Sequence, residues 1–110
     1  MGITIIPTDG FTKELKRLSK KHPAILSDIA QLSAKLKETP TMGTDLGQHV
    51  YKIRLAISGT NKGKSGGARI ITCVVLVREI VFLAEIYLKA EHDTADVNLV
   101  ILRMKDDGLI

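Results

Sequence analysis

The sequence predicts a single small α+β domain in which an antiparallel sheet carries two helices on one face. A length of 110 residues suits one hydrophobic core, so one domain is expected over residues 1–110. Apolar residues recur at helical spacing in the first third of the chain and alternate with polar residues further on. The expected order is β-α-α-β-β-β, with helices over 9–21 and 23–38 and strands over 3–6, 50–57, 68–77 and 80–89.

The first third of the chain is typical of one strand followed by a pair of helices. An apolar run from Ile3 ends at Pro7, and a Thr-Asp-Gly cluster follows it. Pro23 suits the first turn of the second helix, which Thr39-Pro40 ends. The apolar positions of the two helices are Phe11, Leu15 and Leu18 in the first, and Ile25, Ile29, Leu32 and Leu36 in the second.

After Gly43 the apolar period changes to two, which is typical of strands with one buried face. A polar, glycine-rich loop is expected over residues 58–67. Only Arg78-Glu79 separates the next two apolar runs, which predicts a tight two-residue hairpin. The tail is compatible with a short final helix, because its apolar residues are Val97, Val100, Ile101 and Met104.

The positive charge of the chain is concentrated in one segment. No Asp or Glu occurs between Leu46 and Arg78, whereas the rest of the chain has ten basic and twelve acidic residues. Positive charge that is concentrated in one segment indicates a polyanionic partner. Four aromatic residues and no tryptophan disfavour the base-stacking platforms of OB-fold and RRM domains. The six cations of the segment are Lys52, Arg54, Lys62, Lys64, Arg69 and Arg78.

Several other classes of site lack support in the sequence. A phosphate-binding P-loop needs a glycine five positions before Gly63, where this chain has Ser58, and a strand rather than a helix is expected next. The histidines His22, His49 and His92 are widely spaced, so neither a metal nor another cofactor is predicted.

Cys73 is the only cysteine, so no disulfide within the chain is possible. It lies in an apolar run, which favours a small buried side chain over a catalytic thiol. No stretch reaches the roughly 20 apolar residues of a membrane span. We therefore expect a cytoplasmic protein without a membrane partner.

A cationic site is the strongest functional signal in the residues themselves. Lys52 and Arg54 share one face of a strand, and Arg69 opens the next strand. Their strands are expected to present them on the side of the sheet opposite the helices, together with the last strand's Glu85, Tyr87 and Lys89. Arginine forks and lysine ammonium groups suit phosphate. The alternative is a set of exposed strand faces with ordinary charges.

The segments that carry these residues resemble the RelE/ParE toxin superfamily, and the HigB-like branch of type II toxin-antitoxin systems within it. The most specific match is the loop with Arg69, and the resemblance spans roughly residues 3 to 92. A helical pair before a Pro-x-x-Gly turn also matches. The matching strand segments are Val50-Tyr51-Lys52-Ile53-Arg54-Leu55-Ala56, Lys62 to Ile71, and Ile86-Tyr87-Leu88-Lys89-Ala90-Glu91.

The resemblance implies a RelE-like fold and a toxin that a cognate antitoxin holds inactive. It also implies ribosome-dependent endoribonuclease activity (an mRNA interferase), in which the 2′-hydroxyl of the messenger RNA attacks the adjacent phosphate without a metal. Arg69 would stabilise the phosphorane, and Lys52 would act as base or charge stabiliser. The implied catalytic residues are Lys52, Arg54, Arg69 and Lys89, and the implied RNA-binding residues are Lys62, Lys64 and Tyr87.

Two departures from the family pattern keep other functions open. Ala90 stands where RelE has an arginine, and no tyrosine follows Tyr87 in the tail. One alternative is a non-catalytic protein of the same fold that acts only by binding an antitoxin. Another is a ParE-like inhibitor of DNA gyrase.

Overall fold

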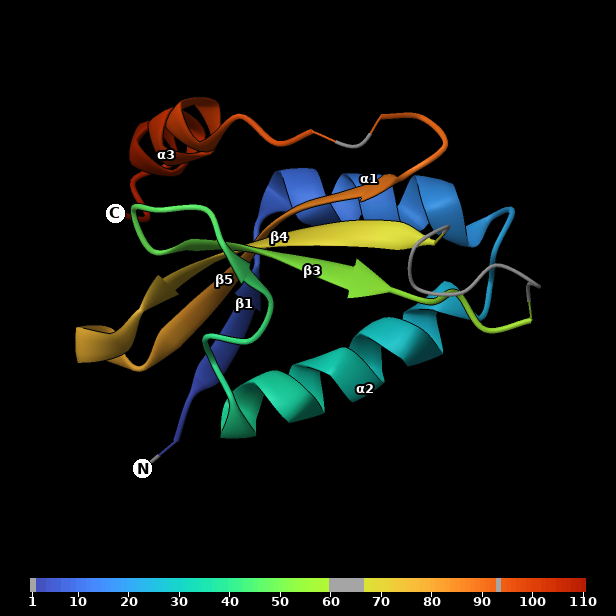
Figure 1. Ribbon diagram of the computed structural model, residues 1–110, viewed down its shortest axis with the longest axis horizontal. Helices are drawn as coiled ribbons and strands as arrows, with labels where there is room; N and C mark the ends of the chain where they lie inside the picture. The colour runs from blue at the N-terminus through green and yellow to red at the C-terminus, as the bar shows by residue number, and fades with distance from the viewer. Residues whose placement is uncertain (1, 60–66, 93) are drawn as a thin grey trace.

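The computed structural model describes residues 2–59, 67–92 and 94–110, so the predicted RNA-binding residues Lys62 and Lys64 lie outside the described residues. The chain forms an α+β domain (Figure 1). Its elements are β1 (Thr4–Pro7), α1 (Asp9–Ser19), α2 (Ile25–Glu38), β2 (Thr44–Asp45), β3 (Val50–Leu55), β4 (Ala68–Val75), the 3₁₀ helix η2 (Leu76–Arg78), β5 (Ile80–Leu88) and α3 (Val97–Asp106).

The sheet is mixed, and the prediction of an antiparallel sheet is wrong for one strand. Its five strands lie in the order β1-β5-β4-β3-β2. The strands β2 to β5 pair antiparallel, but β1 runs parallel to β5, with Ile5 opposite Val81. Apolar alternation identifies a strand and its buried face, but it carries no information on the direction of the neighbouring strand. The short strand β2 was also not expected.

The turn between β4 and β5 is longer than the predicted two residues. β4 ends at Val75, η2 follows, and Glu79 takes a left-handed conformation with φ of 54°. A two-residue hairpin of type I′ needs left-handed conformations at both turn residues, which favours Asn and Gly, and of Arg78 and Glu79 only Glu79 adopts one. As a result Val77 is 95% exposed.

Both predicted helices are present, although the turn between them shortens each. They begin at Asp9 and Ile25 and end at Ser19 and Glu38. The Thr8 hydroxyl oxygen accepts a hydrogen bond from the backbone N–H of Phe11 at 3.1 Å, which caps α1. The apolar stripe of α2 is buried, as predicted, and α1 and α2 pack in one hydrophobic cluster on the same face of the sheet.

The predicted final helix is confirmed, and it packs on the opposite face of the sheet. Val100 and Met104 of α3 pack in a second hydrophobic cluster with residues of β3, β4 and β5. Cys73 belongs to this cluster and is 3% exposed, which confirms the prediction of a buried side chain. Burial raises the pKa of its thiol.

An extra residue in β5 decides which side chains reach the α3 face. Thr72 pairs with Leu83 while its neighbour Ile71 pairs with Glu85, so Ala84 is an additional residue in β5. Such a bulge reverses the alternation of side chains along a strand. Val81 and Leu83 therefore pack on the side of α1 and α2, whereas Glu85 and Tyr87 belong to the other face.

Gly67 is required by a close approach between β3 and the start of β4. A Cβ atom at this position would collide with the backbone carbonyl oxygen of Leu55. The Gly67 carbonyl also accepts a hydrogen bond from the backbone N–H of Lys89 at 3.0 Å. Gly67 thus lets the strand that carries Arg69 lie tightly between its two neighbours.

Candidate functional site

The strand register brings most of the predicted site residues together. Arg54 lies opposite Arg69 in β4, and Arg69 lies opposite Tyr87 in β5. In the next row, Lys52 lies opposite Ile71, which lies opposite Glu85. Residues directly opposite each other in an antiparallel pair point to the same side of the sheet. We call this side, with Lys52, Arg54, Arg69, Glu85 and Tyr87, the β3–β5 face.

The predicted site residues differ greatly in their exposure to solvent. Arg69 is 1% exposed and Tyr87 is 3% exposed, whereas Lys52 is half-buried and Arg54 and Lys89 are exposed. The Arg69 guanidinium donates a hydrogen bond from Nη1 to the Ala68 carbonyl oxygen at 3.2 Å. The face therefore combines accessible cations with a deeply buried guanidinium in their midst.

One cation of the acid-free segment lies elsewhere. The Arg78 guanidinium donates from Nη1 to the Leu109 carbonyl oxygen at 3.1 Å. Arg78 follows β4 at the strand's far end, because Arg69 stands near its beginning. Arg78 is therefore not part of the β3–β5 face.

A pocket of about 480 Å³ lies where β5 meets α1 and α3. Glu85 and Tyr87 belong to its lining, so the pocket adjoins the β3–β5 face. The side chains that bring charge to it are of both signs, and they include Lys13, Arg17, Glu85, Glu91, His92 and Arg103.

His92 is a site residue that the sequence did not reveal. Its imidazole stacks on the Tyr87 ring, with centroids 4.0 Å apart and an interplanar angle of 20°. Its Nδ1 lies 3.3 Å from the Thr94 carbonyl oxygen. Since a carbonyl oxygen only accepts hydrogen bonds, this contact places a proton on Nδ1. No periodic pattern links His92 with Tyr87, so spacing gave no signal of the stack.

Glu85 is a partly buried carboxyl group in the same pocket. Its side chain is 24% exposed, and Arg103 Nη1 lies 3.9 Å from its Oε1. Burial raises the pKa of Glu85, and the positive charge of Arg103 only partly opposes this effect. The Arg103 contact is long for a hydrogen-bonded ion pair.

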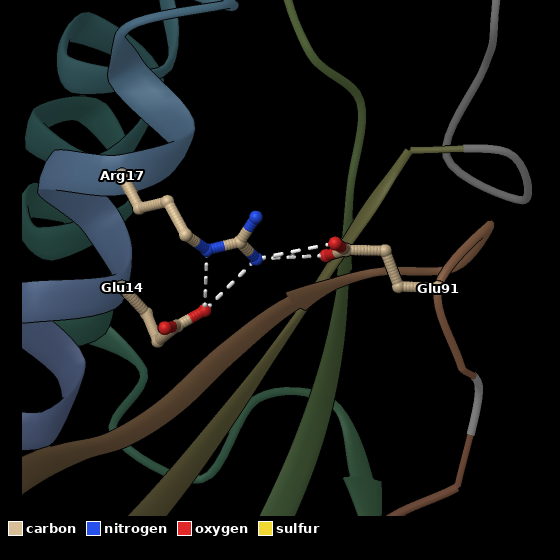
Figure 2. Close-up of polar contacts among 3 residues, drawn as sticks. All are labelled: Glu14, Arg17 and Glu91. Atoms are coloured by element: carbon tan, nitrogen blue, oxygen red, sulfur yellow. Dashed lines mark hydrogen bonds and ion pairs between the residues drawn. The ribbon is translucent and has the colours of Figure 1, made fainter.

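Arg17 connects α1 with the segment that carries His92 (Figure 2). Its Nη2 lies 2.9 Å from the Glu14 carboxylate and 3.0 Å from that of Glu91. The hydrogen bonds that Arg17 donates to Glu91 and then to Glu14 raise the pKa of Arg17, and the bond that Glu91 accepts from Arg17 lowers the pKa of Glu91. These groups are exposed, so water and salt weaken the interaction, and its main effect is to orient the segment.

Asp28 is a second residue whose role the sequence did not reveal. It is 6% exposed, and its carboxylate accepts hydrogen bonds from the Ser58 backbone N–H at 2.8 Å and from the Ser58 hydroxyl. Because Asp28 belongs to α2, this contact anchors the chain where it leaves β3. Asp28 lies beside Ile29 in the apolar stripe of the helix, which could have indicated that its carboxylate is buried. A buried carboxylate needs hydrogen-bond partners from another part of the chain.

The described part of the chain contains no group of three or more His, Cys, Asp or Glu side chains placed to hold a metal ion. In residues 2–59, 67–92 and 94–110, no helix is both long and apolar enough to cross a membrane. No protein-family model and no curated protein matches this chain. Any assignment of function therefore rests on the residues and their geometry.

Proposed function

We propose that the protein is the toxin of a type II toxin-antitoxin system, with a RelE-like fold, that cleaves messenger RNA on the ribosome. The observation that carries the proposal is the register of β3, β4 and β5. It puts Lys52, Arg54, Arg69 and Tyr87 in neighbouring positions on one side of the sheet. A compact group of cations beside an aromatic ring suits an RNA phosphate and the nucleotide attached to it.

The proposed reaction needs no metal, because the RNA supplies its own nucleophile. The 2′-hydroxyl attacks the adjacent phosphate, and the products are a 2′,3′-cyclic phosphate and a 5′-hydroxyl end. Negative charge grows on the phosphate oxygens during the attack, and the guanidinium of Arg69 would stabilise it. Lys52, Arg54 and Lys89 would hold the phosphate, while Lys62 and Lys64 would bind the flanking RNA backbone.

The burial of Arg69 adds a condition to this mechanism. A group that is 1% exposed touches a phosphate only after the atoms that cover it move aside. We propose that RNA binding produces this movement. Once the phosphate is in place, the buried guanidinium favours catalysis. It is held in position by the domain and acts in a medium of low dielectric constant, where its attraction for the phosphate oxygens is stronger.

A non-catalytic protein that acts only through its antitoxin is the second candidate, and two observations favour it. The first is the burial of Arg69 itself. The second is the exposed apolar tip of the β4–β5 turn, where Leu76 is 55% and Val77 95% exposed next to a groove of about 330 Å³. Exposed apolar side chains beside a groove suit a protein partner.

Expression of the chain alone separates the two candidates. The wild-type protein should arrest growth and protein synthesis, and it should cleave a messenger RNA positioned on ribosomes in a single-turnover reaction with EDTA present. The products should carry cyclic-phosphate and 5′-hydroxyl ends. If it causes no arrest and cleaves no RNA, the nuclease proposal is wrong, and arrest with relaxed or broken DNA would indicate gyrase as the target.

The affinity for ribosomes should fall steeply as salt is added, because each lysine or arginine on a phosphate releases condensed counterions. The logarithm of the association constant should change by about 0.7 per phosphate contact for each unit of log salt. Lys52→Ala should reduce the magnitude of this slope by the amount that corresponds to about one phosphate contact. Lys35→Ala, on α2 at the other face of the sheet, should leave it unchanged. A flat salt dependence in wild type would rule out phosphate binding as the main interaction.

A further inference from the structure

The pocket is lined by two side chains that can gain or lose a proton, whereas the arginines of the β3–β5 face cannot. Cleavage by a 2′-hydroxyl requires one group to remove its proton and another to protonate the departing 5′-oxygen. Arginine does neither, because it stays protonated in proteins. Glu85 and His92 both line the pocket, and their charges interact.

Resting on the proposed function, we infer that Glu85 and His92 are the acid–base pair of the cleavage reaction, with Glu85 as general base and His92 as general acid. Tyr87 connects this pair with the phosphate site. It lies opposite Arg69 in the sheet and is stacked on the imidazole of His92. Glu85 precedes Tyr87 by two residues on the same face of β5, so a phosphate held by Arg69 would lie near both groups.

The surroundings of Glu85 suit a carboxylate that takes up a proton. The side chain is partly buried but open to the pocket, and its 3.9 Å separation from Arg103 leaves its oxygens without a tight ion pair there. Burial makes it a stronger base than an exposed carboxylate, since its pKa is raised. The other charged groups that act on it or face the same pocket are Lys13, Glu14, Arg17, Glu91, His92, Asp96 and Asp107.

The surroundings of His92 suit an imidazolium that gives up a proton. The contact between Nδ1 and the Thr94 carbonyl makes Nε2 the atom that gains and releases the second proton. Stacking on Tyr87 fixes the plane of the ring, and the Arg17–Glu91 contact holds the preceding residue against α1. The imidazole is nevertheless exposed, so a substrate can reach it.

The reaction then balances without another reactant. The Glu85 carboxylate takes the proton of the 2′-hydroxyl as the 2′-oxygen forms a bond to phosphorus. The bond between phosphorus and the 5′-oxygen breaks, and its electron pair takes the proton of His92 Nε2. In this scheme Lys52 stabilises charge and is not the base.

Glu85→Gln and His92→Gln test the pair by single-turnover cleavage on ribosomes. Each should slow cleavage by at least about a hundredfold and leave ribosome affinity and thermal unfolding unchanged. The wild-type rate should rise with pH as Glu85 ionises, and Glu85→Gln should remove this rise. His22→Gln, in the turn between α1 and α2, is the matched control and should cleave at the wild-type rate.

A substrate with sulfur in place of the 5′-bridging oxygen distinguishes a general acid from a structural residue. Thiols are far stronger acids than alcohols, so sulfur departs without a proton. His92→Gln should cleave this substrate within about tenfold of wild type, while Glu85→Gln should stay slow. If His92→Gln cleaves the ordinary RNA normally, or cleaves both substrates slowly, the inference is wrong and the proposed nuclease function still stands. A wild-type protein that cleaves nothing overturns both.

Discussion

Replacing Arg69 with alanine is expected to lower the single-turnover rate of RNA cleavage by about a hundredfold to a thousandfold. The guanidinium would face the phosphate oxygens, which gain negative charge in the transition state. Loss of one preorganised donor at such a position costs about 3–4 kcal/mol of transition-state stabilisation, which corresponds to that range of rates. The measurement is cleavage of a messenger RNA positioned on ribosomes, at saturating ribosome concentration.

Because Arg69 is 1% exposed, its removal also leaves a cavity, and the test needs variants that separate catalysis from folding. Arg69→Met fills most of the space without a charge and should cleave as poorly as Arg69→Ala. Arg69→Lys retains a charge without the planar fork and should be intermediate. Arg78→Ala removes an arginine outside the β3–β5 face and should cleave normally. Cleavage by Arg69→Met at the wild-type rate would make Arg69 a structural residue.

The fold was predictable where a periodic pattern covers several turns or a whole strand. The stripe from Ile25 to Leu36 predicted the burial of α2, and the alternation around Ile53 predicted β3. The direction of β1 and the length of the β4–β5 turn were not predictable in this way. Both depend on which segments become neighbours in space, and a pattern within one segment does not contain that information.

The candidate site was predictable to a similar extent. Two-residue spacing placed Lys52 and Arg54 on a common face, and the register confirms that this face also carries Arg69 and Tyr87. Spacing did not predict that Arg69 would be buried, because burial depends on groups from distant parts of the chain. It also gave no sign of the stack between Tyr87 and His92. The segment after β5 has no regular period from which its path could be inferred.

The packing of α3 against the sheet is expected to contribute strongly to the stability of the domain. Met104 is 2% exposed and packs in the same hydrophobic cluster as Tyr87, whereas Leu102, on the same helix, is 54% exposed. Met104→Ala should lower the free energy of unfolding by about 2–5 kcal/mol, since it removes buried methylene and sulfur atoms and leaves a cavity. Leu102→Ala should change it by no more than about 0.5 kcal/mol. Urea denaturation of the two variants measures the difference.

The same pair of variants tests whether α3 organises the proposed site as well as the core. Met104 and Arg103 both line the pocket that holds Glu85 and His92, and Met104 shares a cluster with the ring on which His92 stacks. The Met104→Ala substitution weakens the packing of α3, so the variant should cleave RNA more slowly than wild type even at temperatures where nearly all of the protein is folded. Leu102→Ala should cleave at the wild-type rate. If Met104→Ala loses stability but keeps full activity, α3 stabilises the sheet without positioning the catalytic groups. Equal and small losses of stability in both variants would contradict the packing of α3 itself.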